Sequence, residues 1–188
     1  MSQLSDQTLS QAIQCIHNGG VIAYPTESVY GLGCDPLNHQ AVSKLLEMKQ
    51  RNIGKGLILV ASHIDQVESF VIPPSPINLT RVLSTWPGPF TWIFRAHPDT
   101  PRWITGDHHH SIAIRISAHP VIRALCDSYG KPIISTSANI SGEIPARSDL
   151  MVQRTFGAKV DFIVPGKVGT LTKPTTIRDV MTGETLRA

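Results

Sequence analysis

Apolar residues recur along the chain in two spacings, one typical of amphipathic helices and one typical of buried strands. Helical spacing predicts five helices, over residues 9–16, 41–48, 63–71, 77–86 and 120–126. Short apolar runs predict strands at residues 21–24, 57–60, 90–94, 111–117, 133–134 and 160–164. The last residues predict a hairpin, with strands at 176–180 and 184–187 around the turn Thr182-Gly183.

The order of these elements indicates an α/β (α+β) fold. Helices and strands interleave, so we expect one twisted, open sheet with flanking helices. The close succession of strands between residues 90 and 117, together with the final hairpin, favours a mixed sheet. No repeat and no convincing linker interrupts the pattern, which predicts a single domain over residues 1–188.

Composition excludes several classes of protein. Hydrophobic residues make up 41% and charged residues 16%, which argues against disorder. The formal net charge of +3 is too small to indicate a nucleic-acid partner by itself. We expect a cytoplasmic protein with no membrane segment, because the chain has no long apolar run and its first residues do not resemble a signal peptide.

We expect no protein metal site. The three cysteines, Cys15, Cys34 and Cys126, lack the spacing of zinc ligands and are predicted to be reduced thiols. The internal run His108-His109-His110 has no further ligand pattern beside it, and we interpret it as a mobile loop.

Common nucleotide-binding loops are missing: the sequence contains neither GxxxxGK[ST] nor GxGxxG. A nucleotide would therefore have to be held in another way. Lys49-Gln50-Arg51 and Lys55 place three cations at a helix end and the turn that follows it. They are either a solvated helix end, where cations favour the helix dipole, or a clamp for phosphate or carboxylate.

Two strand-to-loop segments are rich in small polar residues. One is Tyr24-Pro25-Thr26-Glu27-Ser28-Val29-Tyr30-Gly31-Leu32-Gly33, and the other is Ser135-Thr136-Ser137-Ala138-Asn139-Ile140-Ser141-Gly142. Each is either a capped turn or a source of donors for a ligand at a strand end. Arg115 faces away from three isoleucines on an alternating strand, on an exposed sheet face or in a site.

Taken in order, these segments, together with Trp86-Pro87-Gly88-Pro89, resemble the YrdC family over nearly the whole chain, in its short bacterial form. The resemblance implies a twisted sheet with a concave, basic face. It implies the synthesis of threonylcarbamoyl-AMP, pyrophosphate and water from L-threonine, bicarbonate and ATP with Mg²⁺. Separate transferase proteins would use this product to modify adenosine 37 of tRNAs that read codons starting with A.

The resemblance also implies site residues. The family's Lys-x-Arg and Ser-x-Asn tetrad, which lines the substrate pocket, falls on Lys49, Arg51, Ser137 and Asn139. The residues expected near threonine or ATP are Thr26, Ser28, Lys55, Arg115, His119, Ser135, Arg147 and Thr175. One position departs from the family: many members carry Pro-Leu-x-x-His after the tetrad's first half, and Val60 stands here in place of that histidine.

The implied chemistry suits such residues, because carbamate and ATP are both anionic and must be brought together by cations and fixed donors. As roles, Lys49 and Arg51 would neutralise carbamate and α-phosphate, Ser137 and Asn139 would orient them, and Arg115 would hold phosphate. Two other functions stay open: a module that binds tRNA or double-stranded RNA by its phosphates, and an enzyme that acts on another amino acid.

Overall fold

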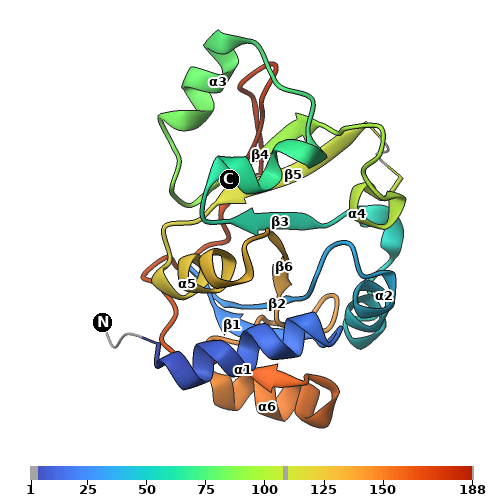
Figure 1. Cartoon of the computed structure of the whole chain (residues 1–188), viewed down its shortest axis with the longest axis vertical. Coiled ribbons are helices and arrows are strands. Elements are labelled where there is room, and N and C mark those ends of the chain that lie inside the picture. The colour runs from blue at the N-terminus through green and yellow to red at the C-terminus, as the bar shows by residue number, and fades with distance from the viewer. Residues whose placement is uncertain (1–3, 108–109, 188) are drawn as a thin grey trace.

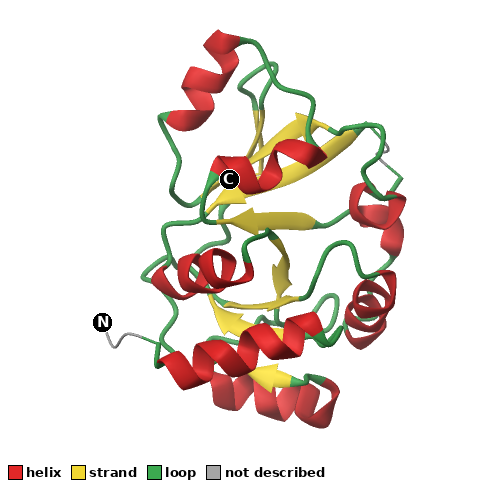
Figure 2. Cartoon of the chain, viewed as in Figure 1, coloured by secondary structure: helices red, strands yellow, loops and turns green. Residues whose placement is uncertain are grey.

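This computed structural model of the protein describes residues 4–107 and 110–187, and its elements are drawn in Figures 1 and 2. The helices are α1 (Asp6–His17), α2 (His39–Met48), α3 (Pro76–Leu83), α4 (Arg102–Thr105), α5 (Pro120–Tyr129) and α6 (Asp149–Phe156), with the 3-10 helices η1 (Ile53–Lys55), η2 (Ile64–Phe70) and η3 (Gly157–Lys159). The strands are β1 (Ile22–Pro25), β2 (Tyr30–Gly33), β3 (Ile58–Ala61), β4 (Phe90–Arg95), β5 (Ser111–Ile116), β6 (Ile133–Ser137), β7 (Phe162–Ile163), β8 (Thr176–Asp179) and β9 (Thr185–Arg187).

The strands of the described chain form one nine-stranded open sheet in the order β7-β1-β2-β6-β3-β5-β4-β8-β9. Its pairs β1–β7, β3–β5 and β4–β8 are parallel, and the other pairs are antiparallel. The prediction of a mixed α/β sheet with flanking helices is confirmed. The final hairpin is also confirmed, as β8 and β9.

The structure differs from the predicted elements in a few places. Residues 63–71 were predicted as a helix, and the structure has the 3-10 helix η2 there. The sequence pattern did not predict β2, α4 or α6. In β2 two of four residues are glycine, which leaves no strand pattern to detect. In α6 only Val152 and Phe156 are buried, which is too few apolar positions for a helical stripe.

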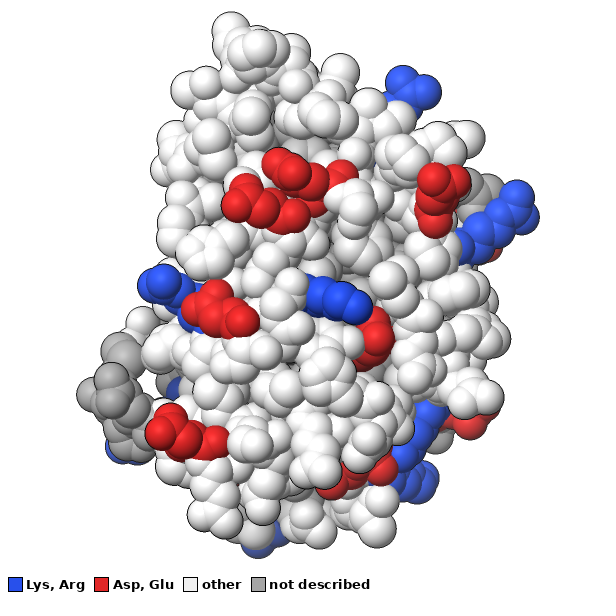
Figure 3. Space-filling model, viewed as in Figure 1, with Lys and Arg blue, Asp and Glu red and all other residues white. Residues whose placement is uncertain are grey.

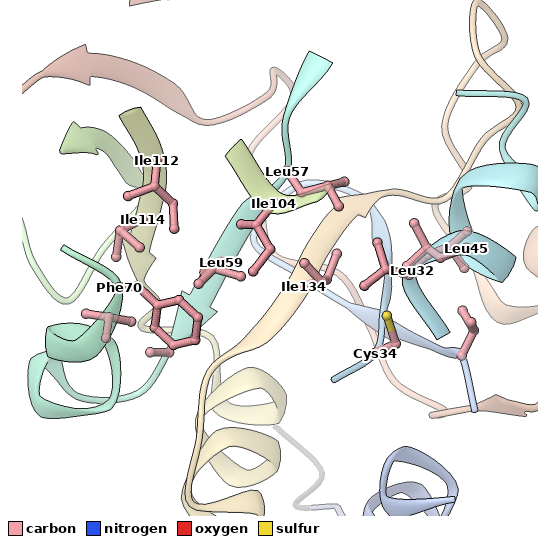
Figure 4. Packing of buried hydrophobic residues seen from close by; sticks show 14 of the residues in the cluster. Leu32, Cys34, Leu45, Leu57, Leu59, Phe70, Ile104, Ile112, Ile114 and Ile134 are labelled. Carbon is pink, nitrogen blue, oxygen red and sulfur yellow. The ribbon is translucent and has the colours of Figure 1, made fainter. Parts of the chain in front are cut away.

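Each face of the sheet carries its own apolar cluster. On one face α1 and α5 cover Ile22, Val60 and Ile133, and Figure 1 shows these two helices in front of the lower strands. The other face is covered in part by α2, through Leu45, and by η2, through Phe70. Figure 4 shows the second cluster, in which Leu32, Leu59, Ile114 and Ile134 come from four different strands. Because α1 and α5 cover only part of their face, the rest of that face is left to form a site.

Two further expectations concern the cysteines and the membrane. All three cysteines are free, as predicted; Cys34 and Cys126 are buried and Cys15 is half-buried. Among the described residues, no helix has the length and apolar character that crossing a membrane requires. His108 and His109 of the histidine run lie outside the described residues.

Gly33 on β2 is predicted to be intolerant of any side chain. A Cβ at this position would lie 2.2 Å from the carbonyl oxygen of Ile134 and 2.9 Å from the Tyr24 ring. We expect Gly33→Ala to lower the free energy of unfolding by about 3 kcal/mol, because overpacking forces the backbone to shift. Urea unfolding followed by circular dichroism measures the loss.

Gly130 gives the matched control. A Cβ there would meet nothing within 4 Å, although φ is +73°. Gly130→Ala should therefore cost only about 1 kcal/mol, from the left-handed backbone. Equal losses in the two variants would contradict the close contact between β2 and β6.

Candidate functional site

A cavity of about 200 Å³ lies over one face of the central strands β2, β6, β3 and β5, between the β1–β2 turn, the residues after α2 and the chain's last hairpin. Predicted site residues that line it are Thr26, Ser28, Arg51, Arg115, Ser135, Ser137 and Thr175. Arg187 lines it as well and was not predicted. Among the described residues, no Asp or Glu lines the cavity, so its walls present guanidinium groups, hydroxyls and a few apolar side chains.

Arg51 reaches the cavity because α2 ends just before it. Lys49 caps the helix, and Gln50 takes a left-handed conformation with φ of +49°, which turns the chain. The Arg51 Nη2 donates to the carbonyl oxygen of Gly56 at 3.0 Å, and its Nε is buried without a partner. Burial lowers the pKa of this guanidinium. Arg51 is thus oriented by one neutral oxygen and keeps donors for an anionic ligand.

Lys49 is placed differently from the expectation. Its side chain is 2% exposed and does not line the cavity. The ammonium donates to the backbone carbonyl of Asn139 at 2.7 Å and to that of Ser137, while the Lys49 carbonyl accepts from Ser141 N at 2.9 Å. Burial and the neighbouring Arg51 lower its pKa to about 8. Lys49 therefore clamps the loop that follows β6.

Asn139 completes this clamp from inside the loop. Its Nδ2 donates to the carbonyls of Ile140 and Glu143 at 2.8 and 2.9 Å, and its Oδ1 accepts from Ser137 Oγ at 2.6 Å. Both amide protons are therefore used by the protein itself. Of the predicted tetrad, Arg51 and Ser137 line the cavity, and Lys49 and Asn139 hold Ser137, at the end of β6, and the loop that follows it.

Arg115, Thr175 and Arg187 form the opposite wall. Arg115 is buried, and its Nη1 donates to Thr175 Oγ1 at 3.0 Å. Arg187 Nη2 donates to the Thr175 carbonyl at 2.8 Å, and burial followed by the charge of Arg115 lowers the pKa of Arg187. Thr175 thus orients both guanidinium groups. Arg115 lies beside Val60 in the sheet and faces away from Ile114 and Ile116, as the alternation predicted.

The turn between β1 and β2 supplies hydroxyls. Thr26 Oγ1 donates to the Val29 carbonyl at 2.7 Å, which closes the turn and leaves Ser28 at the cavity wall. Residues 164–175 cross over this turn: Gly169 N donates to the Thr26 carbonyl at 2.8 Å, and a Cβ on Gly169 would lie 2.5 Å from the Glu27 carbonyl oxygen. This close crossing fixes the turn against the cavity.

Other predicted residues lie away from the cavity wall. Lys55 and Arg147 are exposed, and Arg147 donates weakly to the Leu171 carbonyl at 3.4 Å. His119 is buried next to the site but does not line it; burial lowers its pKa, and its Nδ1 has no partner. Val60, where the resemblance leads us to expect a histidine, is fully buried.

Sequence reasoning missed two residues, Arg187 and Glu27. Arg187 was part of the predicted hairpin, but its spacing gives no sign that it reaches the site. Glu27 lay inside a quoted segment, and a carboxylate beside expected anion-binding groups could have drawn attention to it. On the face in view in Figure 3, Lys and Arg are interspersed with Asp and Glu, and the concave basic face stays a prediction.

Comparison with known proteins gives consistent matches. The family model for Sua5, YciO and YrdC, described as "Telomere recombination", matches residues 14–188. A protein of Coxiella burnetii named threonylcarbamoyl-AMP synthase is 52% identical over 96% of this chain and 97% of its own length. A protein of the same name from Xanthomonas campestris pv. campestris is 49% identical over 95% of this chain and 96% of its own length.

Solved structures agree with this result. P. abyssi Sua5 complexed with L-threonine matches with a TM-score of 0.90 and 29% identity over 98% of this chain. This chain spans about half of that Sua5 chain, 54%. E. coli YciO matches with a TM-score of 0.82 and 26% identity, over 98% of this chain and 92% of its own. The two structures share the sheet described above.

The clamp made by Lys49 generates a prediction about stability and its pH dependence. We expect Lys49→Met to lower the free energy of unfolding by about 3 kcal/mol at pH 7, because two buried carbonyls lose their donor. The folded pKa of Lys49, about 8, is below the ordinary value of 10.5, so the unfolded state binds more protons between these pH values. The stability advantage of the unsubstituted protein over Lys49→Met should therefore grow as pH rises from 8 to 10.

Urea unfolding at several pH values measures this gap. Lys131→Met, which changes an exposed lysine, is the control and should leave stability nearly unchanged at pH 7. A Lys49→Met protein as stable as the original would show that the two carbonyls do not depend on this ammonium.

Proposed function

The chain belongs to the Sua5, YciO and YrdC family, and from this premise we propose that it is a threonylcarbamoyl-AMP synthase, an ATP-dependent nucleotidyltransferase of tRNA modification. It uses L-threonine, bicarbonate and ATP, and it forms threonylcarbamoyl-AMP, pyrophosphate and water. The observation that carries this proposal is the cavity itself, where Arg51, Arg115 and Arg187 meet small hydroxyl residues and no carboxylate of the described chain lines the wall.

The reaction joins two anions. The threonine amine and bicarbonate form a carbamate and release water. A carbamate oxygen then forms a bond to the α-phosphorus of ATP, and the bond from that phosphorus to the bridging oxygen breaks, so that pyrophosphate leaves. Charge repulsion is the main obstacle, and fixed cations and donors lower it by electrostatic stabilisation and positioning. Such a reaction requires no protein nucleophile.

The cavity residues have distinct roles in this proposal. Arg51 and Arg115 face the negative charge that gathers between carbamate and phosphate, and Arg187 adds a third guanidinium for the phosphate chain. The hydroxyls of Ser28, Ser135 and Ser137 orient substrate oxygens. Lys49 donates a hydrogen bond to the Asn139 carbonyl, and the Asn139 side chain accepts one from Ser137. We therefore assign these two residues to holding Ser137 in place.

Mg²⁺ enters the proposal as part of the ATP substrate. The cavity wall offers guanidinium groups and hydroxyls, a donor set that does not suit a divalent cation, which prefers carboxylate oxygens. Among residues 4–107 and 110–187, no group of three His, Cys, Asp or Glu could hold a metal ion. The phosphate oxygens of ATP, and not protein side chains, would therefore coordinate the ion.

The remaining assignments follow from the reaction. We propose that the whole chain, residues 1–188, acts as one domain, because strands from both ends join one sheet. The unstable product would pass to separate transferase proteins that modify adenosine 37 of tRNA, and we propose a cytoplasmic location for the enzyme. Binding of tRNA or double-stranded RNA is a further expectation, which salt-dependent binding assays can test.

The first test of the function is pyrophosphate release. In the original protein, release should require threonine, ATP and bicarbonate together. Arg51→Ala should reduce turnover about a hundredfold or more while the fold survives, because a preorganised cation is lost at the reacting groups. Arg154→Ala, which removes an exposed arginine of α6, should leave turnover unchanged. Near-normal release by Arg51→Ala would contradict the proposed role.

The second test concerns the amino acid. We expect kcat/KM for L-threonine to exceed that for L-serine by about tenfold to 200-fold, because one methyl group in a fitted pocket gives roughly that discrimination. Steady-state pyrophosphate release with each amino acid measures the ratio. Equal values would point to another amino acid as the natural substrate.

A further inference from the structure

A buried carboxylate lies directly behind the arginine wall of the cavity. Glu27 is 9% exposed, and it lies between the cavity hydroxyls Thr26 and Ser28 in the β1–β2 turn. Placing a negative charge next to a site for anionic substrates weakens their binding and carries a desolvation cost. Its presence therefore calls for a physical role.

The contacts of Glu27 divide between its two oxygens. Oε1 accepts from Ser117 Oγ at 2.5 Å, and Ser117 Oγ in turn accepts from His119 N at 3.1 Å. Oε2 has no hydrogen bond and lies 3.6 Å from Arg115 Nη2. The carboxylate is thus anchored through one oxygen, while the other faces the guanidinium at a distance too long for a hydrogen bond.

Arg115 is held from two sides. Nη1 donates to Thr175 Oγ1 at 3.0 Å, Nη2 faces Glu27 Oε2, and Nε is buried without a partner. Because the ion pair is loose, Arg115 keeps hydrogen-bonding capacity that a phosphate can take. An anion that binds Arg115 then has to share it with Glu27, so that the carboxylate opposes the bound anion.

We propose that Glu27 is a positioning residue that aims Arg115 at the cavity and competes with bound anions, so that pyrophosphate is released after the reaction. This inference rests on the proposed function and deepens it. A cavity with three arginines and no opposing charge would hold pyrophosphate tightly, and product release limits turnover in many enzymes. Because its contact with Glu27 is loose, Arg115 can bind the phosphate of the substrate and then release pyrophosphate.

The test replaces the carboxylate by its neutral isostere. Glu27→Gln keeps the size of the side chain and an oxygen for Ser117, but it removes the charge. Isothermal titration of the full chain with pyrophosphate should give a Kd about tenfold lower than that of the original protein, because one opposing charge is lost in a partly desolvated site. In pyrophosphate-release kinetics, KM for ATP should fall and kcat should fall with it, a pattern that simple misfolding would not produce.

Two further variants separate charge from packing. Ser117→Ala removes the anchor of Glu27 and keeps the carboxylate, so pyrophosphate should bind no more tightly than to the original protein. Glu27→Asp shortens the side chain by one methylene and moves the charge away from Arg115, so its Kd for pyrophosphate should lie between those of the original protein and Glu27→Gln. If Glu27→Gln does not fold, Glu27→Asp is compared with the original protein instead.

Equal or weaker pyrophosphate binding by folded Glu27→Gln would overturn the inference, and so would tighter binding by Ser117→Ala. With Glu27→Gln unfolded, equal or weaker binding by Glu27→Asp would overturn it. The titration needs no turnover, so its outcome is independent of the threonine-dependent pyrophosphate release that tests the proposed function.

Discussion

Neutral oxygens accept the hydrogen bonds that orient the three cavity arginines, and the Glu27 carboxylate faces Arg115 at 3.6 Å without a hydrogen bond, so much of their charge stays available to a ligand. Arg51 donates to the Gly56 carbonyl, Arg187 donates to the Thr175 carbonyl, and Arg115 donates to the Thr175 hydroxyl. If carboxylates held these groups, each charge would already be compensated, and an anion would gain little by binding. The arrangement is costly, and lowered pKa values of Arg51 and Arg187 express the cost of burial. When an anionic substrate binds, its charge compensates the buried guanidinium groups and offsets part of this cost.

The mixed sheet is what brings these groups together. The strands β2 and β6 lie between β1 and β3, so residues far apart in sequence become neighbours across the sheet. Gly31 pairs with Ser137, and Ile58 pairs with Ser135, which sets the turn after β1 beside the loop after β6. The Lys49 clamp joins α2 to the same loop. Each of these links is a backbone or backbone-directed contact, so the site's shape depends on main-chain geometry more than on flexible side chains.

The sequence predicted the sheet, most of its helices and the segments that meet at the cavity, because apolar periodicity and loop composition are local properties. It did not predict how individual side chains are used. Lys49 and Arg51 are two residues apart and look equivalent in the sequence, yet the left-handed Gln50 separates a buried clamp from a cavity residue. Arg187 reaches the cavity only through the pairing of β8 with β4, which is a long-range contact that no local pattern encodes. Lys55, Arg147 and His119 do not line the cavity, and their expected contacts with the substrates stay a prediction.

The substitution at Val60 shows how the cavity is bounded. Val60 is fully buried among Val121, Leu125 and Ile133, under α5, and its carbonyl accepts from Cys126 Sγ at 3.5 Å. An imidazole there would be desolvated in an apolar cluster without a partner, which is unfavourable. Ile58 points to the same face of β3 two residues earlier, and it is half-buried and lines the cavity. Ile58 therefore marks the boundary on β3 between the apolar cluster under α5 and the cavity.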